Sequence, residues 1–329
     1  MMAESLARAT QMDYDQAGIE RLVQGLFSLT DGELSIAALV GIGEPSIPAL
    51  RRVLLEGKPS TVYLPRQRVV RALGELGAFY VLSEYLLREK DIRDPELRLA
   101  EEAVENAAAR ELGRCQSDRA FYVLRDLVAT RKLPGAVEPL AHFRREEAAP
   151  ALVAALESDF CRSAAADGIR PIRAAAVPYL IFSVRSPEPS RAEESPSSLR
   201  RRRAALRLLA EEEVDASRWP SLEFLLNESD EWLQSSAAQI AFRLKGSESA
   251  LRILLRHLTS TDWVLVDDIA QFLRQHLSAA RELLVQESNA ASASATPEEE
   301  KRCRLVRWIL NLKQAQPIEE TSCTIVTSR

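Results

Sequence analysis

The five-residue string Ala78-Phe79-Tyr80-Val81-Leu82 constrains the fold more than any other feature of this sequence, because it occurs twice. It returns unchanged at residues 120–124, and a Glu-Leu-Gly turn lies shortly before each copy. Apolar residues at helical spacing follow both copies. A helix-turn-helix unit that recurs along a chain is typical of repeat architectures, in which each unit packs only on its neighbours. The repeat therefore predicts an array of helical hairpins.

The composition favours the same interpretation. Only 12 glycines occur in 329 residues, and alanine, leucine, arginine and glutamate are abundant, which favours helix over sheet. Hydrophobic residues make up 46% of the chain, enough for a large core. The formal net charge of −5 argues against a nucleic-acid-binding surface along the whole chain, although a local basic patch remains open.

Residues 34–55 show the expected punctuation between two helices. Gly41-Ile42-Gly43 ends an apolar segment, Pro45 prevents its continuation, and Ser46 is placed to cap a second helix with Pro48 in its first turn. This helix–turn–helix segment resembles HEAT repeats, in particular the short kind named after phycobilisome lyases, whose turn has a sequence similar to IGEPAVPAL. The resemblance covers residues 19–313, and most units are shorter than the ~40–47 residues of HEAT and armadillo units.

Similar pairs continue along the chain, and together they predict an all-α fold. The resemblance implies a right-handed α-solenoid of about seven or eight HEAT-like helical hairpins. First helices are expected at 34–40, 65–76, 95–112, 136–143, 169–182, 199–210, 230–244 and 262–277, with a closing helix at 298–312. Second helices are expected to start near Ile47, Phe79, Phe121, Ala149, Leu222, Leu251 and Ala280 and to line the concave surface.

Polar, proline-rich and serine-rich stretches predict the boundaries of this array. The expected segments are a polar N-terminal stretch (1–18), a first half of the repeats (19–183), a Pro/Ser-rich loop (184–198), a second half (199–313) with a flexible insert (286–297), and a disordered C-terminal tail (314–329).

The motifs that normally carry catalysis, cofactor binding or metal binding do not occur in the sequence. The four cysteines form no CxxC pair, the three histidines lie outside any HExxH pattern, and no GxxxxGK[ST] loop is present. We therefore expect no catalytic, cofactor-binding or metal-binding residues. The cysteines are widely spaced, and the sequence shows neither a secretory signal nor an apolar run long enough for a membrane span. These features predict a cytoplasmic protein.

The family resemblance brings two enzymatic alternatives. One is a bilin lyase-like activity, which follows from the fold likeness alone. The other is a DNA-glycosylase-like activity, because HEAT-like glycosylases hold alkylated DNA with an aspartate and tryptophans, and Asp267, Asp268 and Trp263 lie close together here. The expectation that we favour is a non-enzymatic scaffold or adaptor that binds a protein partner on its concave surface.

Two groups of residues are candidates for that contact. Tyr80 and Tyr122 occupy the same place in the two copies of the repeated string. Arg200, Arg203 and Arg207 share one face of a helix expected to begin at Leu199, where arginines oppose the helix dipole. Something must offset that cost. It is either a carboxylate of the chain itself, such as those at 193 and 194, or an acidic partner segment or phosphate, which also leaves a nucleic-acid binder through this patch as an alternative.

Overall fold

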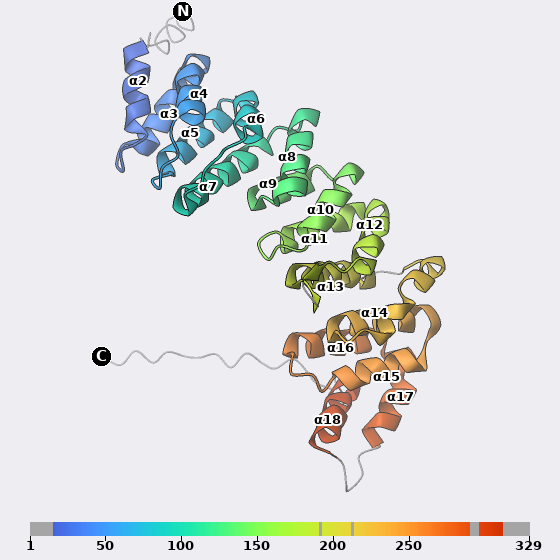
Figure 1. Cartoon of the computed structure of the whole chain (residues 1–329). Helices are drawn as coiled ribbons and strands as arrows, with labels where there is room; N and C mark the ends of the chain where they lie inside the picture. The colour runs from blue at the N-terminus through green and yellow to red at the C-terminus, as the bar shows by residue number, and fades with distance from the viewer. Residues whose placement is uncertain (1–15, 191–192, 212–213, 290–295, 312–329) are drawn as a thin grey trace, which may run out of the picture. The chain divides into compact units, whose positions relative to one another are not determined.

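The regular structure of the described residues is helical apart from one short hairpin. A computed structural model describes residues 16–190, 193–211, 214–289 and 296–311 (Figure 1). The chain divides into two compact units, Met1–Ala204 and Ala205–Arg329, and the division falls within helix α13. Each unit is described by itself. The predicted tail at 314–329 and most of the N-terminal stretch lie outside the described residues, whereas residues 16–18 belong to the first described helix.

The N-terminal unit contains a regular succession of helices. They are α2 (Gln16–Gly25), α3 (Gly32–Ile42), α4 (Ile47–Glu56), α5 (Leu64–Glu75), α6 (Phe79–Leu87), α7 (Pro95–Leu112), α8 (Asp118–Arg131), α9 (Pro134–His142), α10 (Ala149–Ala155), α11 (Arg162–Ile169), α12 (Arg173–Arg185) and α13 (Pro196–Ala210), which crosses into the second unit. Short 3-10 turns precede α4, α10 and α12, at η1 (Glu44–Ser46), η2 (Glu146–Ala148) and η3 (Arg170–Ile172).

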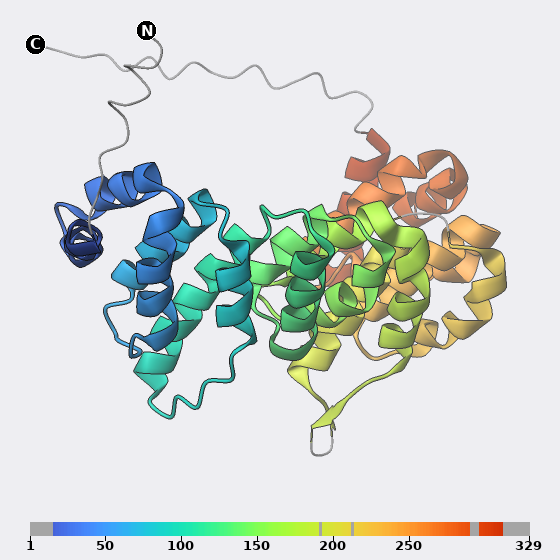
Figure 2. The same ribbon diagram turned by 90° about the horizontal axis from the view of Figure 1, so that it is seen from above.

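Alternate helices of this unit pack on one another in two layers. One layer runs α3, α5, α7, α9 and α11, and the other runs α2, α4, α6, α8, α10 and α12, each helix contacting the next in its layer. Figure 2 shows these helices following one another in chain order. The core lies between the layers, where Leu50, Leu82, Leu124 and Leu152 are fully buried at equivalent positions of successive helices. The helical hairpins predicted for this region are therefore present as pairs of consecutive helices, with one helix in each layer.

Local chemistry explains where the helices end. Gly43 has a φ of 82°, which suits glycine, and its N–H caps the carbonyls of Leu39 and Val40. The sequence predicted that the Ser46 side chain caps the next helix, and this prediction is wrong. The hydroxyl of Ser46 donates instead to the carbonyl oxygens of Leu39 and Gly43, because the 3-10 turn bends the chain back over the end of α3.

One predicted first helix, at 169–182, is assigned to the wrong layer. The structure places α11 in the first-helix layer against α9, and α12 packs against α10 as a second helix. Pro171 interrupts the run between them, since proline has no N–H to donate. A Cβ on Gly168 would lie 2.5 Å from the Cβ of Ala141, so α11 and α9 approach closely through small residues. Such a helix lacks the large apolar residues on which the prediction relied.

The segment predicted as a loop at 184–198 is largely ordered. Helix α12 continues to Arg185, a hairpin pairs β1 (Pro189–Ser190) with β2 (Glu193–Glu194), and α13 begins at Pro196. The hydroxyl of Ser195 accepts the N–H of Ser198 at 3.2 Å, so Ser195 caps α13 and Pro196 occupies its first position. The helix thus starts earlier than the predicted Leu199.

The C-terminal unit holds the remaining elements. They are η4 (Ala216–Ser221), η5 (Glu223–Asn227), α14 (Glu231–Lys245), α15 (Glu248–His257), α16 (Trp263–Gln275), α17 (Leu277–Asn289) and α18 (Pro297–Asn311). The second helix expected near Leu222 is replaced by the two 3-10 turns, because Pro220 cannot donate a helical hydrogen bond. The insert predicted at 286–297 is helical as far as Asn289. Asp230 and Asp262 cap α14 and α16 at equivalent positions.

Candidate functional site

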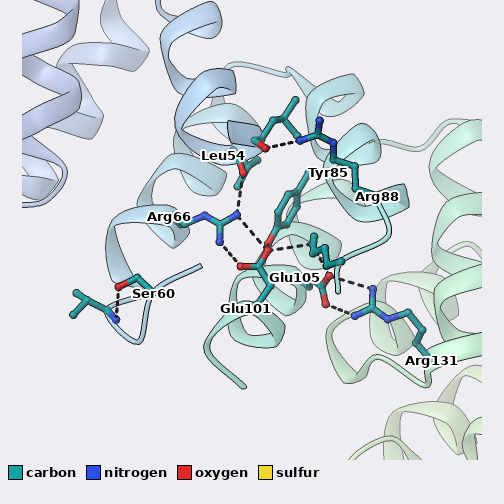
Figure 3. Close-up of polar contacts among 11 residues, drawn as sticks. Leu54, Ser60, Arg66, Tyr85, Arg88, Glu101, Glu105 and Arg131 are labelled. Atoms are coloured by element: carbon teal, nitrogen blue, oxygen red, sulfur yellow. Dashed lines mark hydrogen bonds and ion pairs between the residues drawn. The ribbon is translucent and has the colours of Figure 1, made fainter. Parts of the chain in front are cut away.

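Among the described residues, a buried cluster of charged side chains in the N-terminal unit brings the most ionisable groups into contact with one another (Figure 3). Helix α7 supplies Glu101 and Glu105, one turn apart and only 4% and 3% exposed. Four other elements supply their partners, which are Arg66 from α5, Tyr85 from α6, Lys90 from the α6–α7 loop and Arg131 at the end of α8. We refer to these six residues as the Glu101–Glu105 cluster.

Glu101 forms the inner half of the cluster. The guanidinium of Arg66 binds both of its carboxylate oxygens, and the second of these contacts is 3.2 Å long. The hydroxyl of Tyr85 donates to Glu101 Oε1 at 2.7 Å. Arg66 also donates to the carbonyl oxygen of Leu54 at 2.9 Å, so it ties α5 and α7 to the end of α4.

Glu105 forms the outer half. Arg131 binds both of its oxygens, with a 3.2 Å contact to Oε1, and thereby links α7 to α8. Lys90 lies between the two carboxylates, its Nζ 3.2 Å from Glu101 and 2.5 Å from Glu105. The same ammonium lies 3.6 Å from the centroid of the Tyr85 ring, within cation–π distance.

The electrostatics follow from burial and pairing. Burial alone would raise the pKa of Glu101, but hydrogen bonds from Arg66 and Tyr85 and the nearby cations outweigh it and hold the pKa below its usual value. Burial lowers the pKa of Lys90 despite the two carboxylates beside it. Burial, followed by the charge of Glu101, raises the pKa of Tyr85 far above its usual value. At neutral pH the carboxylate of Glu101 is therefore charged and the phenol of Tyr85 is neutral.

Two open cavities flank this cluster. One, of about 600 Å³, is bounded by the ends of α6, α7 and α8, and the other, of about 410 Å³, lies toward the end of α4. Lys90, Glu101 and the loop residues Arg88, Glu89 and Ile92 line both of them. The side chain of Lys90 and its loop therefore form the wall that the two cavities share.

The sequence did not predict this cluster. The sequence predicted a helix at 95–112, and Glu101 and Glu105 lie beside its apolar face in the helical period. One signal was present. Two glutamates at i and i+4 repel each other on a helix, so their occurrence next to the buried face suggests that cations from elsewhere accompany them.

The structure places the two predicted tyrosines on neighbouring helices. Tyr80 is the second residue of α6 and Tyr122 lies in the second turn of the neighbouring helix α8, and their side chains are 55% and 46% exposed. Helices α6 and α8 contact each other, so both aromatic side chains lie on the solvent side of one helix layer. The guanidinium of Arg125 lies 4.9 Å from the centroid of the Tyr122 ring. The preceding phenylalanines differ, since Phe121 is fully buried whereas Phe79 is only half-buried.

The predicted arginine group is largely occupied by contacts within the chain. Arg200 donates to the carbonyl oxygen of Glu157 and lies 3.7 Å from Asp159, whereas Arg207 pairs with Asp268 at 3.4 Å. Arg203 is half-buried. The two arginines between the predicted ones are also paired, Arg201 with Glu157 and Glu188, and Arg202 with Glu194.

These contacts match the internal explanation that the sequence left open. Because α13 begins at Pro196, the arginines lie beyond its first turn. The unfavourable interaction between their charges and the helix dipole is weaker there than in the first turn. Neighbouring carboxylates then offset the remaining cost.

The residues that suggested a glycosylase all lie on α16, where Trp263 and Asp267 are exposed one turn apart and Asp268 is half-buried. Asp268 accepts a hydrogen bond from Gln239 at 2.8 Å and pairs with Arg207, so it links α13, α14 and α16. Trp263 is 77% exposed at the start of α16. Asp268 therefore serves helix packing.

Comparison with known proteins assigns no family. A scan against protein-family models finds no match for this sequence, and a search of curated proteins also finds none. Within the described residues, no group of three or more histidine, cysteine, aspartate and glutamate side chains could hold a metal ion. In the same part of the chain, every helix is too short or too polar to cross a membrane.

Proposed function

We propose that this protein is a non-enzymatic scaffold or adaptor, built as a right-handed HEAT-like α-solenoid, that binds a protein partner on its surface. Support for the solenoid comes from the two layers of alternate helices in the N-terminal unit. Each helix there buries its apolar face against its neighbours in sequence, which is how repeat arrays are stabilised.

One observation carries the binding function. The repeated string presents Tyr80 and Tyr122 to solvent at equivalent positions, while Val81 and Val123 beside them are buried. Tyrosine is enriched at protein interfaces because it offers a large apolar ring and a polar tip. Pro48 and Pro150 are exposed at the corresponding places of α4 and α10 and extend this row to four helices. We call these four residues the tyrosine row.

The enzymatic alternatives have no comparable support in the described residues. The Glu101–Glu105 cluster contains the most strongly perturbed groups, yet its carboxylates, phenol and ammonium are bonded to one another. Groups with perturbed pKa values occur in structural ion-pair networks as well as in active sites, and these bonds match the structural case.

The test uses a double substitution in the tyrosine row. The Tyr80→Ser, Tyr122→Ser variant should keep its fold, because both side chains are about half exposed, but should lose the partner. Immobilised wild-type and variant proteins are incubated with extract of the native host, and the retained proteins are compared by mass spectrometry. Tyr63→Ser is the matched control, since Tyr63 is 41% exposed at the start of α5, in the other layer. An identical set of retained proteins for all three would contradict the proposal.

A further inference from the structure

The tyrosine row leads directly to the larger cavity beside Lys90. Leu87 follows Tyr80 by two helical turns, so it lies on the same stripe of α6, about 10 Å further along. On α8, Asp126 and Thr130 follow Tyr122 along one stripe in the same way. Leu87, Asp126 and Thr130 all line the cavity of about 600 Å³. A segment bound across the tyrosines therefore reaches this cavity.

Lys90 is the one member of the Glu101–Glu105 cluster that comes from a loop. Residues 89–93 make no backbone hydrogen bond within the described structure, and most of their side chains are exposed. Besides Ile92, which is half-buried, the ammonium of Lys90 is the main anchor of this stretch. The other cations of the cluster, Arg66 and Arg131, are held on α5 and α8.

The two carboxylates also do not need Lys90 for their own neutralisation. Arg66 binds both oxygens of Glu101, and Arg131 binds both oxygens of Glu105. Lys90 is thus a third cation beside two charges that are already paired. Its burial costs hydration, which is consistent with the lowered pKa of its ammonium.

The geometry points to a cation-binding subsite, formed by Glu101, Glu105 and the face of the Tyr85 ring, that Lys90 occupies in the free protein and that a lysine or arginine side chain of the bound partner takes over. This inference rests on the proposed scaffold function and names the chemistry of its partner. The position of Lys90 itself shows that the subsite accepts an alkylammonium group. When the partner's cation enters, Lys90 moves into water with its loop, and the wall between the two cavities opens.

The subsite is tested first with a small probe and the full-length protein. The Lys90→Ala variant leaves the subsite empty, and n-butylammonium, which resembles a lysine side chain, should fill it. At about five times its Kd the probe should raise the melting temperature of the variant by about 2–4 °C. Butanol, which lacks the charge, should do less, and the wild type should respond less because Lys90 already occupies the site. Equal responses of variant and wild type would overturn the assignment.

The exchange is tested in the wild type, which also covers the case in which Lys90→Ala fails to fold. Acetylation of lysines by a water-soluble reagent is followed by mass spectrometry. In the free protein Lys90 should react more slowly than the exposed Lys58. Hexa-arginine, whose guanidinium groups do not react, should raise the rate at Lys90 toward that at Lys58, whereas hexa-citrulline should not. A rate at Lys90 that hexa-arginine leaves unchanged would refute the exchange.

The two proposals fail separately. Neither experiment on Lys90 uses a natural partner, so a negative result there leaves the test of Tyr80 and Tyr122 untouched. Conversely, loss of the scaffold function would not remove the response to n-butylammonium.

Discussion

Substitution of one residue of the Glu101–Glu105 cluster should destabilise the protein more than substitution of a neighbouring surface residue. Glu101 bonds to side chains from α5, α6 and the α6–α7 loop, so it joins three elements to α7. Breaking a buried ion pair from one side leaves the other charge without compensation, which costs more than the pair itself contributes.

Replacing Glu101 by glutamine should therefore destabilise the protein by about 3–5 kcal/mol at neutral pH. The pKa of Glu101 is lowered in the folded state, so its contribution is present above the usual value of 4.5 and is lost as pH falls through the folded pKa. The wild type should lose stability over that acid range, whereas Glu101→Gln should lose less. Urea unfolding between pH 7 and pH 3 measures both effects.

Glu102→Gln is the control for this change. Glu102 is the next residue of α7 and is half-buried, and no bond from its side chain is shown in the described structure. Its substitution should cost under about 0.5 kcal/mol. Similar losses for the two variants would show that the cluster does not stabilise α7.

At the scale of elements, the close packing of α11 on α9 depends on Gly168. Replacing glycine by alanine inside a helix ordinarily stabilises it by about 1 kcal/mol. At Gly168 the new methyl group would meet Ala141 at 2.5 Å, and separating the two helices should cost about 1–3 kcal/mol. We therefore expect Gly168→Ala to be destabilising in thermal or urea unfolding.

Gly41→Ala provides the opposite expectation. Gly41 lies in α3, and a Cβ there would meet nothing within 4 Å. This substitution should stabilise the protein by up to about 1 kcal/mol. If both alanines stabilise, the contact between α9 and α11 is looser than the structure shows.

Whether a helix could be predicted from the sequence depended on the size of its apolar residues. Helices with large apolar residues, such as α5 and α16, could be predicted because leucine and valine recur in them at helical spacing. Helix α11 could not, because its buried residues are Ala165, Gly168 and Ile169, and small residues give little periodic signal. The start of α13 was predicted too late because Ser195 and Pro196 resembled a loop, although they form a cap and a first turn.

The candidate site was predictable only in part. Tyr80 and Tyr122 could be selected because an exact repeat placed them at equivalent positions. The Glu101–Glu105 cluster could not, because its members come from residues 66 to 131 and meet only after the helices pack.

The layered arrangement of the N-terminal unit implies that a destabilising substitution increases local unfolding first in the helices next to it. Leu124 is fully buried in α8, which contacts α6, α9 and α10. Leu124→Ala should cost about 2–5 kcal/mol. Because repeat arrays couple mainly through nearest neighbours, amide hydrogen exchange should accelerate in α6 to α10 and change little in α14 to α17. Uniform acceleration along the chain would argue against a solenoid.

The cluster on α7 has a further consequence for the order in which the chain folds. Glu101 and Glu105 repel each other at i and i+4, and no cation on α7 itself pairs with them in the described structure. Their burial becomes favourable only when the side chains of α5, α8 and the loop have arrived. We expect contacts completed this late to be absent from the folding transition state, so that substitutions in the cluster raise the unfolding rate more than they lower the folding rate. The cluster would then set the lifetime of the native N-terminal unit more than the speed of its formation.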